Sequence, residues 1–160
     1  MSDLAHPVIG FRLWNRRGDE LRPYRDVPSA PSWRPGVNEA TCDAPHPSPT
    51  TDCDCGLHSF HTLDGLLSWL NLPSLRQDRP AEVFGITRSW GRIAVFRGSL
   101  AAQFSEVIAL ADSRSDPDGL RALAACYGVP LIARDGLETW AAEFGDSVPM
   151  RLRPPTECPA

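Results

Sequence analysis

The segment from Val27 to Asp52 constrains the fold more than any other part of the chain, because it cannot become a helix. Its prolines stand among mostly polar residues and are Pro28, Pro31, Pro35, Pro45, Pro47 and Pro49. Proline lacks a backbone N–H and clashes with the preceding helical turn, so no helix survives this spacing. A long connection without secondary structure is uncommon in a compact domain and is usually functional or disordered. We therefore predict that residues 28–58 form one proline-rich loop. Because it has no secondary structure, another interaction would have to hold it in a defined conformation.

Composition places the chain among ordinary globular proteins. It has 160 residues, of which 42% are apolar and 22% are charged, enough for one domain with its own core. The net charge of -4 argues against a broad nucleic-acid surface. No window approaches the roughly 18 apolar residues of a membrane-spanning helix, and the first residues lack the pattern of a secretory signal. We expect a cytoplasmic protein whose thiols stay reduced.

The pattern of apolar residues predicts a mostly antiparallel sheet. Residues 8–14 and 20–25 flank a Gly-Asp turn, as in a β-hairpin, and Pro23 restricts the second strand to a sheet edge. Residues 82–88 and 92–97 flank Ser-Trp-Gly and predict two further antiparallel strands. The segment from Ser99 to Ala111 fits a helix or a strand, and we favour a strand because it would extend the sheet.

A first helix is predicted just after the loop. Apolar residues recur there at helical spacing, with Thr62 as the N-cap and Pro73 as the stop: Leu63, Leu66, Leu67 and Leu70.

Two more helices are predicted in the C-terminal third. Asp116 caps the first, which has Pro117 at its first position and ends at Gly128. A short buried strand follows at 129–133. Asp135 and Glu138 match a capping box that opens the last helix, which ends at Gly145. The inner face of that helix is predicted to be Leu137, Trp140, Ala141 and Phe144.

These elements predict one α+β domain over residues 1–150, with a mostly antiparallel sheet and about three helices. Residues 151–160 are predicted to be a flexible tail.

Soft metal ligands concentrate in CDAPHPSPTTDCDCGLH, residues 42–58, which holds three of the five cysteines. Cys42, His46, Cys53 and Cys55 follow the pattern C-x3-H-x6-C-x-C and supply a Cys3His set for tetrahedral Zn²⁺. Gly56 would let the backbone turn tightly and free amides to donate to the thiolates. The sequence therefore predicts a structural zinc site that pins the proline-rich loop to the helix after it.

Other ligand sets and a catalytic metal are alternatives at this stage. His58 and His61 lie three residues apart near the helix start and are possible replacements for His46. A catalytic zinc needs an open position and a general base, and Glu39 is the carboxylate close to the cluster that suits that role. Neither H-E-x-x-H nor the zinc-deaminase pattern is present. A Cys55 nucleophile paired with a nearby histidine is a weaker possibility.

The cysteines have a non-metal interpretation as well. Free cysteine often behaves as a small buried hydrophobe, which suits Cys126 in its apolar helix. Burial as a small hydrophobe is a poor explanation for Cys53 and Cys55, because their neighbours in the sequence are polar. A disulfide between these two would close a strained ring.

Candidates for a partner surface are Trp33, Arg88, Trp90 and Arg92. Our first hypothesis is a zinc-stabilised module that binds a protein or a small ligand. The second is a small zinc-dependent enzyme with Glu39 as base. The third is a nucleic-acid-binding regulator that uses the 88–92 residues, and the acidic balance counts against it.

The order of short motifs resembles a family of small, uncharacterised actinobacterial proteins. The motifs are Trp33-Arg34-Pro35-Gly36, Glu39-Ala40-Thr41-Cys42, His46-Pro47, Cys53-Asp54-Cys55-Gly56, Trp90-Gly91-Arg92 and Tyr127-Gly128-Val129-Pro130. The resemblance implies a bacterial source and a Cys/His set that belongs together, and it carries no activity.

Overall fold

The computed structural model describes residues 2–3, 6–24, 31–72 and 82–154. Its strands are β1 (Ser2–Asp3), β2 (Val8–Arg17), β3 (Glu20–Pro23), β4 (Val37–Glu39), β5 (Leu57–Phe60), β6 (Glu82–Val95), β7 (Ser99–Ala111) and β8 (Leu131–Ile132). Its α-helices are α1 (Leu63–Leu70), α2 (Pro117–Tyr127) and α3 (Leu137–Phe144), with short 3-10 turns at Arg134–Gly136 and Met150–Leu152. The described chain confirms the predicted α+β class. None of its helices is long and apolar enough to span a membrane.

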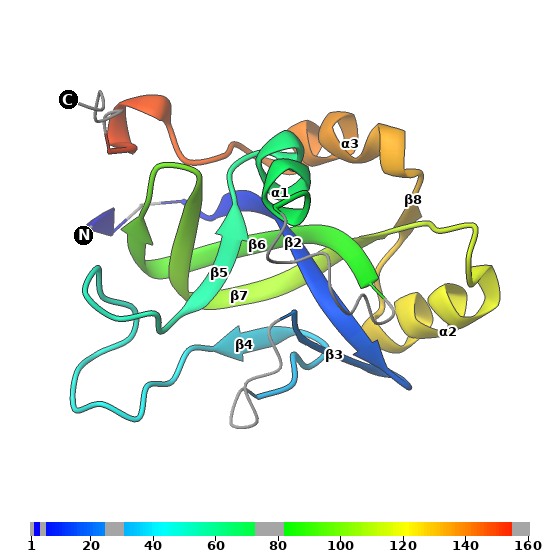
Figure 1. The fold of residues 1–160 in the computed structure, drawn as a ribbon, viewed down its shortest axis with the longest axis horizontal. Coiled ribbons are helices and arrows are strands. Elements are labelled where there is room, and N and C mark those ends of the chain that lie inside the picture. Colours follow the sequence, from blue (N-terminus) through cyan, green and yellow to red (C-terminus); the bar gives the residue numbers. More distant parts are fainter. Residues whose placement is uncertain (1, 4–5, 25–30, 73–81, 155–160) are drawn as a thin grey trace.

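Four strands pair into a closed ring, which Figure 1 shows at the centre of the molecule. β6 pairs with β2, β2 meets β5 at Phe11 and Phe60, β5 pairs with β7, and β7 pairs back with β6. β1, β3 and β4 add to the edges as antiparallel strands, whereas β8 pairs with β7 in parallel. β5, β4 and β8 pair in succession with residues 99–102, 104–106 and 110–111 of the long strand β7.

The predicted break at Ser-Trp-Gly is wrong, because β6 is one continuous strand. Its register against β7 shifts between Trp90 and Ile93, and Gly91 has a φ of 78° there. A glycine in this conformation bends a strand without reversing it, as in a β-bulge. The chain reverses instead between β6 and β7, where Phe96 N donates to Ser99 O at 2.8 Å. The predicted strand from 99 to 111 is confirmed.

Alternate side chains of β2 enter two different cores, as the two-residue period of a strand requires. Ile9, Phe11 and Leu13 pack with the buried faces of α1 and α3. Trp14 packs with Trp33 and the buried face of α2. In Figure 1, α1 and α3 lie together on one side of the strands and α2 lies apart from them.

The predicted start of α1 and both predicted ends of α2 are confirmed. Thr62 caps α1 by accepting from Gly65 N at 3.0 Å, and Asp116 caps α2 by accepting from Gly119 N at 3.1 Å. Gly128 ends α2 in the left-handed conformation. Pro73 lies outside the described residues.

The predicted capping box of the last helix is wrong. Residues 134–136 form a 3-10 turn first, so α3 begins at Leu137 and no side chain caps it. Leu137 and Ala141 are buried as predicted, but Phe144 is 56% exposed. Its ring stacks on that of Trp140, with 3.9 Å between the ring centroids. An apolar residue at the helix end can satisfy a periodic pattern and still have no core above it.

The start of the predicted tail is held to the domain. Arg153 donates from Nε and Nη2 to the carbonyl of Val148, at 3.1 and 2.9 Å. Residues 155–160 lie outside the described part of the chain.

Candidate metal centre

The cysteine cluster lies on the connection between β4 and β5, residues 40–56, which we call the metal loop. β4 pairs with residues 104–106 of β7, and β5 pairs with residues 99–102 of the same strand. The metal loop therefore leaves and rejoins one edge of the sheet at neighbouring places. The proline-rich segment is not wholly irregular as predicted, because it contains β4 and a bridge between Leu21 and Trp33.

One buried point anchors the middle of the metal loop. Ser48 is 8% exposed, and Pro49 is fully buried. Arg92, from β6, donates through Nη1 to the carbonyl of Ser48 at 3.2 Å. Two of the candidate ligands precede this anchor and two follow it, so the loop folds back on itself around Pro49.

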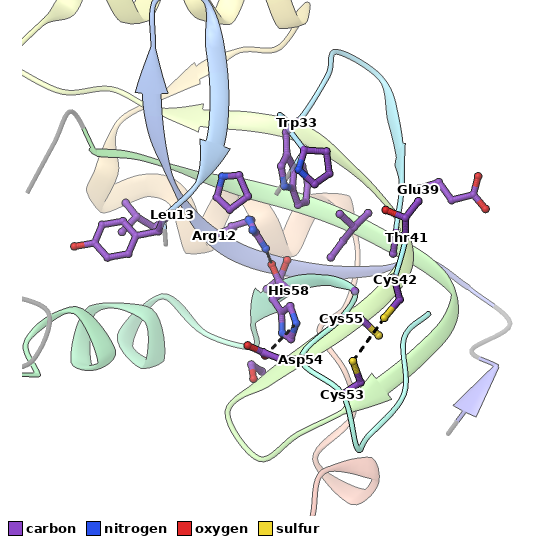
Figure 2. Close-up of a pocket in the computed structure, with 18 of the residues that line it drawn as sticks. Arg12, Leu13, Trp33, Glu39, Thr41, Cys42, Cys53, Asp54, Cys55 and His58 are labelled. Atoms are coloured by element: carbon purple, nitrogen blue, oxygen red, sulfur yellow. Dashed lines mark hydrogen bonds and ion pairs between the residues drawn. The ribbon is translucent and has the colours of Figure 1, made fainter. Parts of the chain in front are cut away.

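This folding brings the four predicted ligands together. One ligand atom from each of Cys42, His46, Cys53 and Cys55 lies within 4.8 Å of every other. Cys42 Sγ is 3.7 Å from Cys53 Sγ and 3.4 Å from His46 Nε2. Zn–S and Zn–N bonds of about 2.3 and 2.0 Å at tetrahedral angles place S···S edges at about 3.8 Å and S···N edges at about 3.5 Å. The observed S···S and S···N distances thus match two edges of a tetrahedral site. Figure 2 shows the sulfur atoms converging.

The imidazole of His46 is oriented for metal binding. Its Nδ1–H donates to the carbonyl of Pro47 at 3.1 Å, so the neutral ring carries its lone pair on Nε2. Nε2 is the atom that faces Cys42 Sγ. A backbone carbonyl on the second ring nitrogen fixes the tautomer in many metal sites.

The surroundings of Cys53 and Cys55 shift the pKa values of these two thiols in opposite directions. A hydrogen bond with the Cys55 side chain, followed by one with Cys42, raises the pKa of Cys53 to about 11. Burial would raise the pKa of Cys55, but hydrogen bonds from the Ser48 side chain and the Thr50 backbone lower it overall. The donors around Cys55 therefore favour its thiolate, which is the form that binds metal.

Gly56 fits the role predicted for it. Its φ is 115°, and a Cβ there would lie 2.8 Å from Pro49 Cβ and 2.9 Å from Ala101 Cβ. Only glycine lets the chain turn from Cys55 into β5 at this close approach.

The structure separates the two alternative histidines from the cluster. His58 Nε2 lies 3.7 Å from Asp54 Oδ1, and burial, then Arg12, lowers the pKa of His58. His61 is 2% exposed and donates from Nε2 to the carbonyl of Phe96 at 2.9 Å. Neither belongs to the group of converging ligand atoms.

Glu39 is not placed as a base for this cluster. Its side chain is exposed, and Figure 2 shows the carboxylate directed away from the sulfur atoms. The predicted burial of Cys126 is also wrong, because this thiol is exposed on α2.

The four residues predicted as a partner surface do not form one patch. Trp33 is 3% exposed, with its ring 5.4 Å from Trp14 in an edge-to-face contact. On β6, Arg88 pairs with Glu106, and Trp90 stacks on Phe104. Arg92 is half-buried over the metal loop.

A cavity of about 680 Å³ lies beside the metal loop and was not predicted from the sequence. Cys42, Cys53 and Cys55 form part of its wall, opposite Arg12 and Trp33. An arginine in a strand of apolar residues marked this place in the sequence, but the partners of that arginine come from distant segments.

In comparisons with protein-family models, curated proteins and solved structures, this chain found no match. Its function therefore has to be argued from the site.

Proposed function

We propose that this protein is a zinc-stabilised binding module, in which Cys42, His46, Cys53 and Cys55 hold a structural Zn²⁺. The observation that carries the proposal is the convergence of four ligand atoms within 4.8 Å from a loop with little other support. Among the described residues, one backbone hydrogen bond joins the metal loop to the sheet, from Ala40 N to Gln103 O at 2.7 Å. A bound metal ion would hold the metal loop in one conformation, which this single backbone hydrogen bond does not do.

The donor set favours zinc in a structural role. Thiolate and imidazole are the ligands of tetrahedral Zn²⁺. Four protein donors complete the coordination sphere, whereas a catalytic zinc keeps one position for water. The direction of the Glu39 carboxylate, away from the sulfur atoms, supports the same choice.

The metal would fix the loop as one wall of the cavity, which supports a module that binds a small ligand or a protein segment. A nucleic-acid partner is less well supported, because the charge of Arg88 is already paired with Glu106. Free thiols in this arrangement suit a reducing compartment such as the cytoplasm.

The test is the metal content of untagged, purified protein, measured by elemental mass spectrometry. We expect about one zinc per chain in the wild type and less than a tenth of that in Cys55→Ser. Cys126→Ser is the matched control, because this exposed thiol lies on α2. Its zinc content should equal that of the wild type. Protein without metal, or Cys55→Ser with full zinc, would reject the proposed site.

The choice of histidine is tested by a second pair of variants. His46→Ala should lose zinc, whereas His58→Ala should keep it, because His58 faces Asp54 instead of the sulfur atoms. If His46→Ala keeps zinc and His58→Ala loses it, His58 is the fourth ligand instead of His46.

A further inference from the structure

Arg12 is a partly buried cation that neither the metal site nor the sheet explains. It lies between Phe11 and Leu13 on β2. Its Nη1 donates to the carbonyl of His58, and its guanidinium lies over the ring of Trp33, 4.5 Å from the centroid. Its Nε is buried and has no hydrogen-bond partner within the described chain.

Within the described chain, no acidic group forms an ion pair with Arg12. Burial lowers the pKa of its guanidinium to about 9. The group still carries its charge at neutral pH. A buried, unpaired charge is costly, and natural proteins retain one where it serves a ligand or a reaction.

Arg12 lines the cavity beside the metal loop. The cavity volume of about 680 Å³ lies within the range of small-molecule sites. Aromatic rings of Tyr24, Trp33, Phe60 and Trp69 also line it. Figure 2 shows Arg12 between Trp33 and His58.

We propose that this cavity binds a small aromatic carboxylate, with Arg12 paired to the carboxylate and the aromatic rings packed around the apolar body. The carboxylate supplies the acceptor and the charge that Arg12 lacks. This proposal names the ligand class of the binding module and rests on that function only for the wall formed by the metal loop.

The charges around the cavity favour a monoanion. Arg12 is the one arginine among its described lining residues, which include Glu39, Asp43 and Asp54. A dianion such as phosphate would be repelled by these carboxylates, and Arg12 alone would neutralise only one of its two charges. A carboxylate needs only that one cation, and its planar oxygens match the guanidinium.

The test compares two probes of the same shape, benzoate and benzamide, by NMR titration against the zinc-loaded wild type. We expect benzoate to bind at least tenfold more tightly, because benzamide has no charge for Arg12. Equal binding of the two probes, or no binding of either, would overturn the proposal. This comparison needs no variant, so it stands whether or not an Arg12 variant folds.

A pair of variants then assigns the selectivity to Arg12. Arg12→Met should lose at least tenfold in benzoate affinity while its melting temperature stays equal to or above that of the wild type, because an unpaired buried charge has been removed. Arg121→Met, which removes an exposed charge from α2, should bind benzoate as the wild type does. Unchanged benzoate binding in Arg12→Met would overturn the assignment.

Zinc content measured on the same samples keeps the two proposals apart. Zinc retained by Arg12→Met together with lost benzoate binding supports the cavity site alone. A wild type that discriminates benzoate from benzamide but contains no zinc supports the cavity site and rejects the structural metal.

Discussion

At the scale of single residues, Gly56 decides how Cys55 enters the cluster. The chain must pass from the third thiol into β5 while Pro49 and Ala101 lie against it. The positive φ and the close contacts are two separate demands, and glycine meets both.

Replacing Gly56 by Ala should destabilise the protein. The left-handed backbone costs a non-glycine residue about 1–2 kcal/mol, and the contacts of the added Cβ at 2.8 and 2.9 Å cost roughly a further 1–3 kcal/mol of overpacking. The sum of these two costs is the expected loss in the free energy of unfolding, which chemical denaturation measures. Zinc content should fall in the same variant, because Cys55 would be displaced.

Gly36→Ala is the matched control for this effect. Gly36 also has a positive φ, of 79°, but no atom lies within 4 Å of its added Cβ. Gly36→Ala should lower the free energy of unfolding only by the cost of the left-handed backbone, about 1–2 kcal/mol. Equal destabilisation of the two variants would show that the packing around Gly56 is unimportant.

At the scale of elements, α2 is joined to the ring by its N-cap residue. Asp116 accepts from Gly119 N with Oδ1 and lies 2.7 Å from Arg16 Nη1 with Oδ2. One carboxylate thus caps the helix and ties it to the end of β2. The side chain is 51% exposed, so the ion pair is screened by water and contributes little.

We therefore expect the cap to dominate over the ion pair. Asp116→Ala should lower the free energy of unfolding by about 1 kcal/mol, the usual value of a lost N-cap. Asp116→Asn keeps a capping oxygen and removes the charge, so it should lie within about 0.5 kcal/mol of the wild type. Denaturant titration of both variants separates the two contributions, and equal losses would assign the effect to the ion pair instead.

At the scale of the whole molecule, the ring and the metal loop depend on different forces. The two main cores are built from β2, β6, β7 and the helices, and none of the four ligands belongs to either. The metal loop holds to the ring through few backbone contacts and the anchor at Ser48. Its order should depend on metal, whereas that of the ring should not.

Removal of zinc by a chelator should therefore loosen the loop first. Amide hydrogen exchange is expected to rise at least tenfold across residues 41–56, while amides in β6 and β7 keep their protection. The melting temperature should also fall, because a ligand that binds only the folded state stabilises it. Equal exchange throughout the chain after chelation would show that the ring cannot persist without the metal.

Local patterns predicted much of this protein. Thr62, Asp116 and Gly128 act within one turn of their own positions, so their capping roles can be read without knowing the fold. The Cys3His set was also predictable, because its members lie close in sequence and the prolines force the chain between them to turn. The choice between His46, His58 and His61 stayed open in the sequence, and the structure places His46 with the three cysteines.

Other features depended on contacts between distant segments. A bulge and a turn both need a flexible glycine, so Gly91 alone could not show that β6 continues. The burial of Trp33 and the exposure of Phe144 depend on which elements lie above them. The surroundings of Arg12 come from β2, from β5 and from the proline-rich segment.

By itself, the sequence determined the fold class, the N-caps of α1 and α2 and the four residues of the candidate metal site, because these follow from short-range backbone sterics and ligand chemistry. The tertiary structure decided the closed ring, the cavity and the unpaired charge of Arg12. Strand pairing joins residues far apart in the chain, and only those pairings place aromatic rings and thiols in one cavity with the guanidinium of Arg12.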